Sequence, residues 1–458
     1  MINLTNREYK ESIDITKAGD FEEAKEMIDK ANLPLYFTID MLKSYGPSML
    51  NRNCNGMMKN AVIGGTERQV ISSQALNRVI REQMSDAVFM KTKTGHLAVT
   101  DKIINSAEEI SDEQINYAMF IAAMIMYQDT KTSTKTLDLG NAYNAFRSKT
   151  SDPYSARDIE TFAEIVSDAL NDQDVIAETD KAIEEAKKAF EKGGRSKIVK
   201  LNIGKKTLKY AEKVNEYMKT RKIDIAQAFF GSFSTSNTCE TVESAVKKGI
   251  SYGIGPIGSA EYDWTAINTF FPKSKELKPL MRDGADNINT SFIAANTFYE
   301  KSKVDMRCAL LNMFKNENFD DKNMVRKDVE DAAEYLAYYI WCFAFAVPSG
   351  GQHTAYASSL PDALAVRPAR SPQTDVALDA EFSKACDGSD GIEKGIEKMK
   401  NGLENAPEGF FGIDENRKKY WCGPEEKTPE GYKYYSFKNL KNLTEEIRED
   451  LCHALLND

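Results

Sequence analysis

The 458-residue chain carries 60 Lys and Arg against 70 Asp and Glu, which gives a formal net charge of −10. This excess of acid argues against a protein that coats itself uniformly in nucleic acid, because such proteins are basic. Hydrophobic residues make up 41% and charged residues 28%, as in a globular chain with a core. The longest apolar runs, Tyr117–Tyr127 and Tyr335–Val347, are shorter than the about 20 residues of a membrane span. We therefore expect both to be core segments.

Cysteine and histidine usage predicts a cytoplasmic protein without a zinc ribbon or a histidine-rich metal site, so metal chemistry would have to rest on carboxylates alone; we expect no metal and no cofactor. The seven cysteines are scattered and include no C-x-x-C pair, which is typical of a reducing compartment rather than of a disulfide framework. The three histidines, His96, His353 and His453, do not have metal-binding spacing. The first residues lack the apolar segment of a signal peptide.

Charge is distributed unevenly along the chain. Residues 34–81 hold six basic and two acidic residues, a local +4, and residues 196–222 hold nine basic and two acidic residues, a local +7. Residues 1–33 stand at −3 and residues 375–458 at −7. Each basic segment is either a solvated face or a binding surface for an anionic partner, and charge alone does not decide between the two.

The front of the chain shows strand, turn and helix signals in close succession. Apolar residues alternate over Leu35–Met41, which predicts a half-buried strand with Tyr36, Thr38 and Asp40 on its exposed face. An Asn-rich loop at 51–55 follows, and Gly64-Gly65 predicts a turn between short extended pieces.

Ser72-Ser73 are expected to cap a helix over Gln74–Met84. On this helix, Leu76, Ile80 and Met84 recur at four-residue spacing and predict the core face. The opposite stripe holds Gln74, Arg78 and Arg81. A capped helix start behind a glycine turn is suited to binding backbone phosphates.

The rest of the chain divides into a helical stretch and a mixed stretch. Residues 85–222 show helical periodicity, with a capping box at Ser111-x-x-Gln114. After residue 223, Phe292–Asp305 could be a strand and Asp328–Phe345 predicts a long buried segment. An amphipathic helix at the end of the chain is predicted from its apolar residues, which are Leu440, Leu443, Ile447, Leu451 and Leu455.

Three motifs in the front of the chain resemble one known family. They are Leu50-Asn-Arg52, Lys59-Asn-Ala-Val-Ile-Gly-Gly65 and Arg68-Gln-Val-Ile-Ser-Ser-Gln-Ala-Leu-Asn-Arg78. In this order and spacing they resemble CasC, the backbone subunit of the type I-E CRISPR surveillance complex Cascade. Shorter segments follow in the family's order: Ala228–Gly231 with Phe233, Phe298-Tyr299 with Val304-Asp305, and Val347-Pro348 with Gln352 and Ala355–Ala357. The resemblance covers residues 34–82, 223–306 and 346–370.

The resemblance implies an α+β fold in which residues 34–84 and 223–458 form an RRM-like, ferredoxin-type palm. Residues 85–222 would be a helical fingers insertion, and a thumb hairpin would protrude near residues 250–292. Residues 1–33, which the resemblance does not cover, are expected from their own pattern to form an N-terminal helical extension. It also implies a non-enzymatic crRNA-binding protein whose copies line up along the guide and present its bases for pairing with target DNA. The implied partners are crRNA, target DNA through the guide, further copies of the chain and other Cascade subunits, without a membrane.

Carried over by matching position, the resemblance implies a set of crRNA-contacting residues. They are Arg52, Lys59, Ser72, Ser73, Gln74, Arg78, Arg81, Phe233 and Gln352. An aromatic ring at Phe233 could stack on a base, or it could belong to the core beside Phe229 and Phe230. Several positions depart from the family and lack its basic or aromatic residue: Thr66, Asn77, Ser232, Thr265 and Gly351. The basic segment at 196–222 could compensate for the phosphate binding that these departures remove, or it could be a solvated helix.

Two other classes of function stay open at this point. An RNA-processing endoribonuclease on a related fold would need a general base, and His353 beside Gln352 is the candidate. A nucleic-acid-free interaction scaffold would use the acidic terminal segments as its surfaces.

Overall fold

The computed structural model describes residues 12–31, 33–84, 89–92, 94–107, 109–127, 131–132, 152–191, 199–200, 203–232, 241–257, 259–265, 288–348, 359–372, 376–388, 390–406 and 417–457. The chain is α+β, as expected, with the strands of one large sheet interleaved with helices along the sequence. Among the helices of these ranges, none is both long and apolar enough to cross a membrane.

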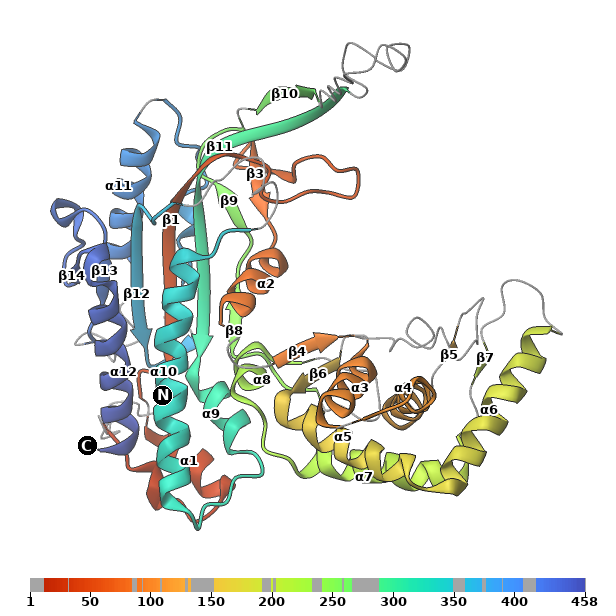
Figure 1. Cartoon of the computed structure of the whole chain (residues 1–458). Helices are drawn as coiled ribbons and strands as arrows, with labels where there is room; N and C mark the ends of the chain where they lie inside the picture. Colours follow the sequence, from red (N-terminus) through yellow and green to blue (C-terminus); the bar gives the residue numbers. More distant parts are fainter. Residues whose placement is uncertain are drawn as a thin grey trace, which may run out of the picture.

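A mostly antiparallel sheet, ten-stranded in the described part of the chain, forms the centre of the larger body (Figure 1). The strands follow the order β14-β13-β12-β1-β11-β9-β3-β2, and β8 and β10 pair with β11 outside this path. We call this sheet and the helices packed on it the palm body. Its strands are β1 (Tyr36–Ser48), β2 (Asn60–Ile63), β3 (Thr66–Ile71), β8 (Val246–Lys248), β9 (Ser251–Gly253), β10 (Ser259–Thr265), β11 (Ile288–Asp305), β12 (Ala363–Ala369), β13 (Tyr420–Cys422) and β14 (Lys433–Tyr435).

The strand predicted over Leu35–Met41 is confirmed as β1, but its predicted exposed face is wrong. Thr38 and Asp40 are buried, because β1 is a central strand between β11 and β12 and both of its faces are covered. Asp40 accepts a hydrogen bond of 2.6 Å from the hydroxyl of Tyr299 and pairs at 2.6 Å with Arg367 of β12. A buried carboxylate is tolerated when it is paired and hydrogen-bonded in this way.

Helices cover both faces of the sheet. On one face, Phe37, Ile39 and Met41 of β1 join the main core. The helices that contribute to this core are α1 (Phe21–Ala31), α2 (Ser73–Gln83), α8 (Ile225–Phe230), α9 (Met306–Phe314), α10 (Lys322–Phe345) and α12 (Leu440–Leu456). On the other face, α11 (Gly391–Glu404) packs with Leu42 and Trp421. The predicted buried segment at 328–345 and the predicted C-terminal helix are thus confirmed as α10 and α12.

The described N-terminal residues pack on the palm body. A 3-10 turn (Ile15–Lys17) and α1 place Ile15 and Ile28 in the main core. The backbone N–H of Ile13 also donates to the carbonyl of Ala454 on α12, at 2.8 Å.

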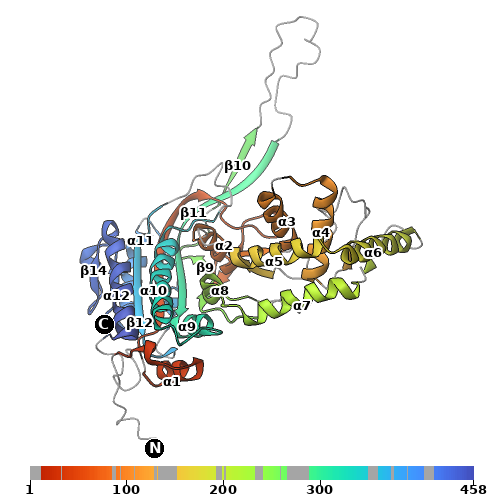
Figure 2. The ribbon, with the colours of Figure 1, turned by 60° about the horizontal axis from the view of Figure 1, so that its bottom comes forward.

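Two hairpins leave the palm body near each other. β2 and β3 pair around the predicted Gly64-Gly65 turn, and α2 (Ser73–Gln83) follows with Ser72 as its N-cap. β10 pairs with the first part of β11, and this ribbon extends beyond the sheet in both ribbon views (Figures 1 and 2). The ribbon lies within the predicted thumb, and residues 266–287 at its end are outside the described residues.

A second body, which we call the helical lobe, lies to one side of the palm body (Figures 1 and 2). It has its own hydrophobic core, which includes Val99, Phe120 and Val214. Its helices are α3 (Gly95–Ser106), α4 (Asp112–Tyr127), α5 (Ala156–Leu170), α6 (Gln173–Glu191) and α7 (Lys205–Thr220). The capping box is confirmed, because Ser111 and Gln114 exchange side-chain and backbone hydrogen bonds at 3.0 and 3.2 Å. Short pairs β4 (Phe89–Thr92) with β6 (Asp152–Ser155), and β5 (Lys131–Thr132) with β7 (Val199–Lys200), were not expected.

Candidate nucleic-acid interface

The loop after β1 folds back on itself and presents two basic side chains. The backbone N–H of Lys59 donates to the carbonyl of Asn51 at 2.9 Å, which closes the loop. Inside it, the side-chain oxygen of Asn53 accepts two backbone hydrogen bonds, at 2.9 and 3.0 Å, and Gly56 adopts a left-handed φ of 76°. Arg52 is exposed and Lys59 is half-buried. The loop therefore holds both cations on an internally bonded turn.

The start of α2 lies directly beside this loop. The side-chain oxygen of Asn51 accepts a hydrogen bond of 3.1 Å from the backbone N–H of Ser72. The hydroxyl of Ser72 in turn accepts from the N–H of Ala75, at 3.4 Å. The first N–H groups of a helix lack partners within the helix and carry its positive dipole end. The start of α2, at Ser73 and Gln74, can therefore receive an anionic group such as a phosphate.

The three residues of the predicted stripe on α2 differ in their exposure. Gln74 and Arg78 are exposed, with 74% of the Arg78 side chain accessible, but Arg78 pairs with Glu82 at 2.7 Å. Arg81 is half-buried and donates to the carbonyl of Asn77 at 3.3 Å. Burial lowers the pKa of Arg81, although an arginine remains charged. The exposed positive charge of this helix is therefore smaller than the sequence suggested.

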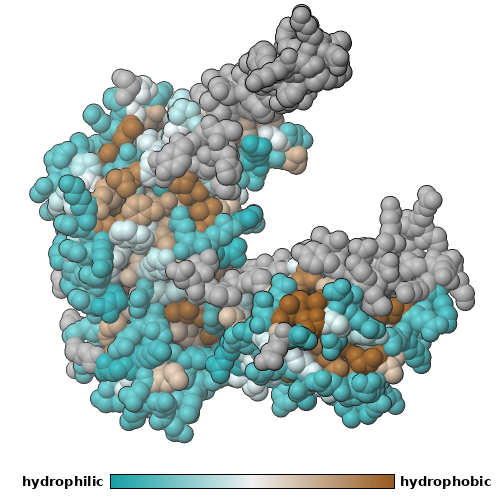
Figure 3. All heavy atoms as spheres, in the orientation of Figure 1, coloured by the Kyte–Doolittle hydropathy of each residue, from teal (hydrophilic) through white to brown (hydrophobic). Residues whose placement is uncertain are grey.

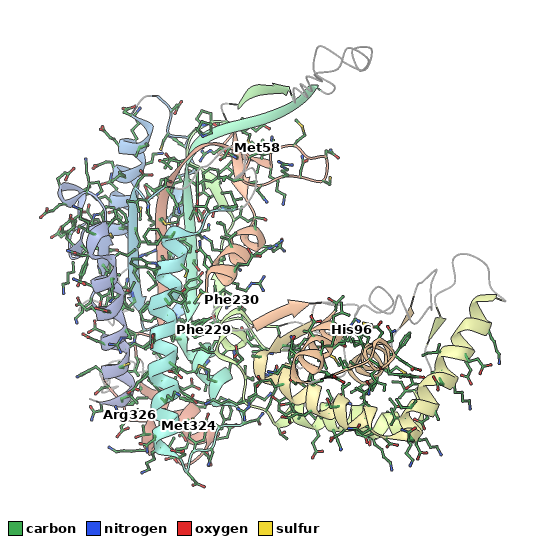
Figure 4. The ribbon with its side chains drawn as sticks, in the orientation of Figure 1. Met58, His96, Phe229, Phe230, Met324 and Arg326 are labelled. Atoms are coloured by element: carbon green, nitrogen blue, oxygen red, sulfur yellow. The ribbon has the colours of Figure 1, made fainter. Side chains whose placement is uncertain are left out.

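A small hydrophobic cluster packs the loop and the helix against the central sheet. Tyr45 of β1, Leu50 at the start of the loop, Ile71 of β3 and Leu76 of α2 pack with Phe298 of β11. The ring centroids of Tyr45 and Phe298 lie 5.5 Å apart in an edge-on arrangement. Loop, hairpin and helix are thereby joined to the central strands. Met58, labelled in Figure 4, is a buried residue of the same loop.

The loop and α2 lie on the side of the palm body that faces the helical lobe (Figure 1). The space-filling view shows the surface hollowed between these two bodies (Figure 3).

Two of the six basic residues in the segment 34–81 do not reach the surface. Lys43 is fully buried and donates to the carbonyl of Ala344. Arg68 is also fully buried and donates to the carbonyls of Phe382 and Ser383, at 2.7 and 2.9 Å. Both cations bind backbone carbonyls inside the fold and do not face solvent. The remaining basic residues of the segment are Arg52, Lys59, Arg78 and Arg81.

The basic segment at 196–222 is also partly neutralised. Lys206 pairs with Asp174 at 2.6 Å, and Arg221 pairs with Asp158 at 3.3 Å. Lys222 lies 2.5 Å from each of two carboxylates, those of Glu317 and Asp328. The remaining lysines along α7 are exposed: Lys205, Lys209, Lys213 and Lys219.

The aromatic motif at the end of α8 belongs mainly to the core. Phe229 is fully buried with its ring 4.7 Å from that of Tyr335, and Phe230 packs at 6.0 Å from Tyr339 (Figure 4). Ser232, which stands where the family has an arginine, is buried and accepts from the side chain of Gln227 at 2.9 Å.

Two predicted contact residues, Phe233 and Gln352, lie outside the described residues, and so do Gly351 and His353. Within the described part, no group of three or more His, Cys, Asp and Glu side chains is placed to hold a metal ion. His96 is buried in the helical lobe (Figure 4), where burial lowers its pKa to about 4. The role of Asn51 was missed at the sequence level, although an asparagine directly before Arg52 was part of the recognised motif.

A protein-family model described as CT1975-like protein (Cas_CT1975) matches residues 37–448. The chain belongs to this Cas family. Two solved structures share its fold over nearly their whole length. One, titled "CRISPR RNA-guided surveillance complex, pre-nicking", matches with a TM-score of 0.62 and 18% identity, over 91% of this chain and 100% of that one. The other, titled "CRISPR RNA-guided surveillance complex", matches with a TM-score of 0.55 and 17% identity, over 90% and 99%. A comparison with curated protein sequences gave no match.

Proposed function

We propose that this Cas-family chain is a non-catalytic, crRNA-binding backbone subunit of a type I-E Cascade complex. Copies of it oligomerise along the guide spacer and present the guide's bases for pairing with target DNA. The proposal rests on two observations together. The chain has the fold of two surveillance-complex structures, and it carries a surface suited to contacts with a nucleic-acid backbone. That fold likeness spans 91% of the chain. The surface consists of the Arg52–Lys59 loop next to the start of α2.

The chemistry of this surface favours backbone contacts over base reading. Two cations and the free N–H groups of a helix start recognise phosphate oxygens, which carry no sequence information. The neighbouring hydroxyl and amide groups of Ser72, Ser73 and Gln74 can reach sugar oxygens, including the 2′-hydroxyl of RNA. A subunit that serves any spacer needs this kind of contact, because the guide itself supplies sequence specificity.

The net charge of −10 does not conflict with this role. The potential that an RNA feels in a groove is set by nearby charges rather than by the total. In the part of the chain that the structure describes, few exposed cations lie on the candidate surface, so we expect moderate affinity from a single copy. Neighbouring copies on one guide would then raise the overall affinity through multivalency.

Binding of a repeat–spacer RNA by the purified chain tests the proposal, with cleavage followed in the same samples. The proposal expects binding that is insensitive to the spacer sequence and RNA that stays intact. Site-specific cleavage of repeat RNA that is abolished by His353→Ala would support the endoribonuclease instead. A chain that binds no RNA under any condition would support the interaction scaffold.

A further inference from the structure

Four ionisable side chains meet inside the palm body where α10 ends. Lys248 Nζ lies 3.3 Å from a carboxylate oxygen of Glu300, and these two side chains are 0% and 1% exposed. The hydroxyl of Tyr45 donates to the other oxygen of Glu300 at 2.6 Å. Lys43, fully buried, completes the group and lies with its Nζ 5.4 Å from the ring of Tyr45. Ionisable groups are rarely buried in such number, because desolvating their charges is costly.

Lys43 acts on the end of α10. Its Nζ donates to the carbonyls of Ala344 and Ala346, at 2.9 and 3.1 Å. The last carbonyls of a helix lack partners within the helix and form its negative dipole end. Glycine often ends a helix, but here Ala346 is the C-cap residue, with φ of −59°. The buried ammonium group of Lys43 therefore supplies hydrogen bonds to the carbonyls at the end of α10, in place of a capping turn.

The end of α10 is connected to the candidate interface through the next residue. Val347 packs against the cluster of Tyr45, Leu50, Ile71 and Leu76 that supports the loop and α2. The hydroxyl of Tyr45, besides its bond to Glu300, lies 3.4 Å from the carbonyl of Ala346. A continuous set of contacts thus runs from Lys43 through Ala346 and Val347 to α2.

We propose that Lys43 is a positioning residue for the RNA-binding surface. By holding the last carbonyls of α10, it keeps Val347 packed against the hydrophobic cluster, and this cluster then holds α2 and the Asn51 loop in their binding arrangement. This inference rests on the proposed RNA-binding function and adds to it a buried residue that touches no RNA.

The same strand provides a matched control. Asp40 of β1 is fully buried and pairs at 2.6 Å with Arg367. It lies on the opposite face of the sheet, where its partner Tyr299 packs with the α11 side. Breaking this pair also disturbs a buried charge on β1, but it leaves the end of α10 untouched. A purely structural role of Lys43 would make the two substitutions equivalent.

The test compares full-length wild type, Lys43→Met and Asp40→Asn in binding to one repeat–spacer RNA, at a temperature where all three are folded. Lys43→Met is expected to weaken binding roughly three- to thirtyfold, as is usual for residues that act on a site through others. The salt dependence of binding should not change, because Lys43→Met removes no cation that contacts phosphate and Arg52 and Lys59 are still present. Asp40→Asn should stay within about twofold of wild type, and hydrogen exchange at Val347 and at the start of α2 should rise only in Lys43→Met.

Val347→Ala keeps the inference testable if Lys43→Met does not fold. Val347 is half-buried, so its truncation is milder, and it should weaken RNA binding in the same direction. Unchanged affinity in Val347→Ala or in folded Lys43→Met, or an equal loss in Asp40→Asn, overturns the positioning role and leaves the proposed function standing. A wild-type chain that binds no RNA overturns the proposed function and this inference with it.

Discussion

The side-chain oxygen of Asn51 accepts a hydrogen bond of 3.1 Å from the backbone N–H of Ser72, 21 residues further along the chain. This bond joins the loop that presents Arg52 to the residue that caps α2. The cations of the loop and the N–H groups of the helix start are therefore fixed relative to each other. A phosphate backbone needs this fixed spacing in order to contact both at once.

Asn51→Ala is expected to weaken RNA binding several-fold and to lower the free energy of unfolding by about 1 kcal/mol, because it removes a hydrogen bond to a backbone donor. Urea unfolding and RNA titration measure the two effects. Asn55→Ala is the control, because Asn55 is exposed in the same loop and its side chain makes only a weak contact with Cys54, at 3.7 Å. Equal RNA affinity in both variants would contradict the proposed role of the Asn51–Ser72 bond.

Arg52→Ala combined with Lys59→Ala should weaken guide binding to a similar extent for every spacer sequence, because phosphate contacts carry no base information. The slope of log affinity against log salt should become shallower by about 1.4, because each neutralised phosphate of a single strand contributes about 0.7. Lys25→Ala with Lys30→Ala on α1 removes two charges elsewhere and should leave the slope unchanged. A decrease in affinity that depends on the spacer sequence would argue for base reading by the protein.

Gly231 and Gly56 both have left-handed φ values, 62° and 76°, but their surroundings differ. A Cβ at Gly231 would lie 2.7 Å from the backbone nitrogen of Ser244, whereas nothing lies within 4 Å of one at Gly56. Gly56→Ala should therefore lower the free energy of unfolding by about 1 kcal/mol, from backbone strain alone.

For Gly231→Ala we expect a loss of more than about 3 kcal/mol, because the backbone must also shift. Urea denaturation of the two variants measures the difference. Equal destabilisation by both substitutions would contradict the close approach of Ser244 to Gly231 at the end of α8.

Burial lowers the pKa of His96 to about 4, from an ordinary value of 6.5. Between these pH values the unfolded chain binds a proton that the folded chain does not, so stability rises with pH across this window. At pH 4, the lowered pKa of His96 decreases the free energy of unfolding by about 3 kcal/mol relative to its value above pH 6.5. His96→Phe removes this decrease, so the stability of the variant relative to wild type should increase from pH 6.5 down to pH 4. Parallel pH profiles of the two proteins in urea unfolding would show that His96 does not titrate in this way.

Local features of the fold could be predicted from sequence because their causes lie within a few residues. The alternation of β1, the glycine turn of the β2–β3 hairpin and the Ser72 cap of α2 are all such features. Buried charges could not be predicted, because their partners are distant in the chain. Asp40 lies 327 residues from Arg367, Lys43 lies 301 from Ala344, and Arg68 lies 314 from Phe382.

The same distinction applies to the candidate interface. The Asn-rich stretch at 51–55 located the loop and Ser72-Ser73 located the helix start, since each signal is short and continuous in sequence. Its electrostatics could not be predicted, because the pairing of Arg78 with Glu82 and the partial burial of Arg81 depend on side-chain packing. The short strand pairs of the helical lobe were missed for a related reason, since two-residue strands such as β5 and β7 are too short to show a period.

The central claim is that copies of this chain assemble along a guide RNA. It is tested most directly by co-expressing the chain with CRISPR arrays of different spacer lengths and measuring the mass and absorbance ratio of the purified particles. We expect RNA-containing particles whose mass rises with spacer length in steps of one chain. RNA-free monomers, or particles whose mass does not change with the spacer, would contradict it.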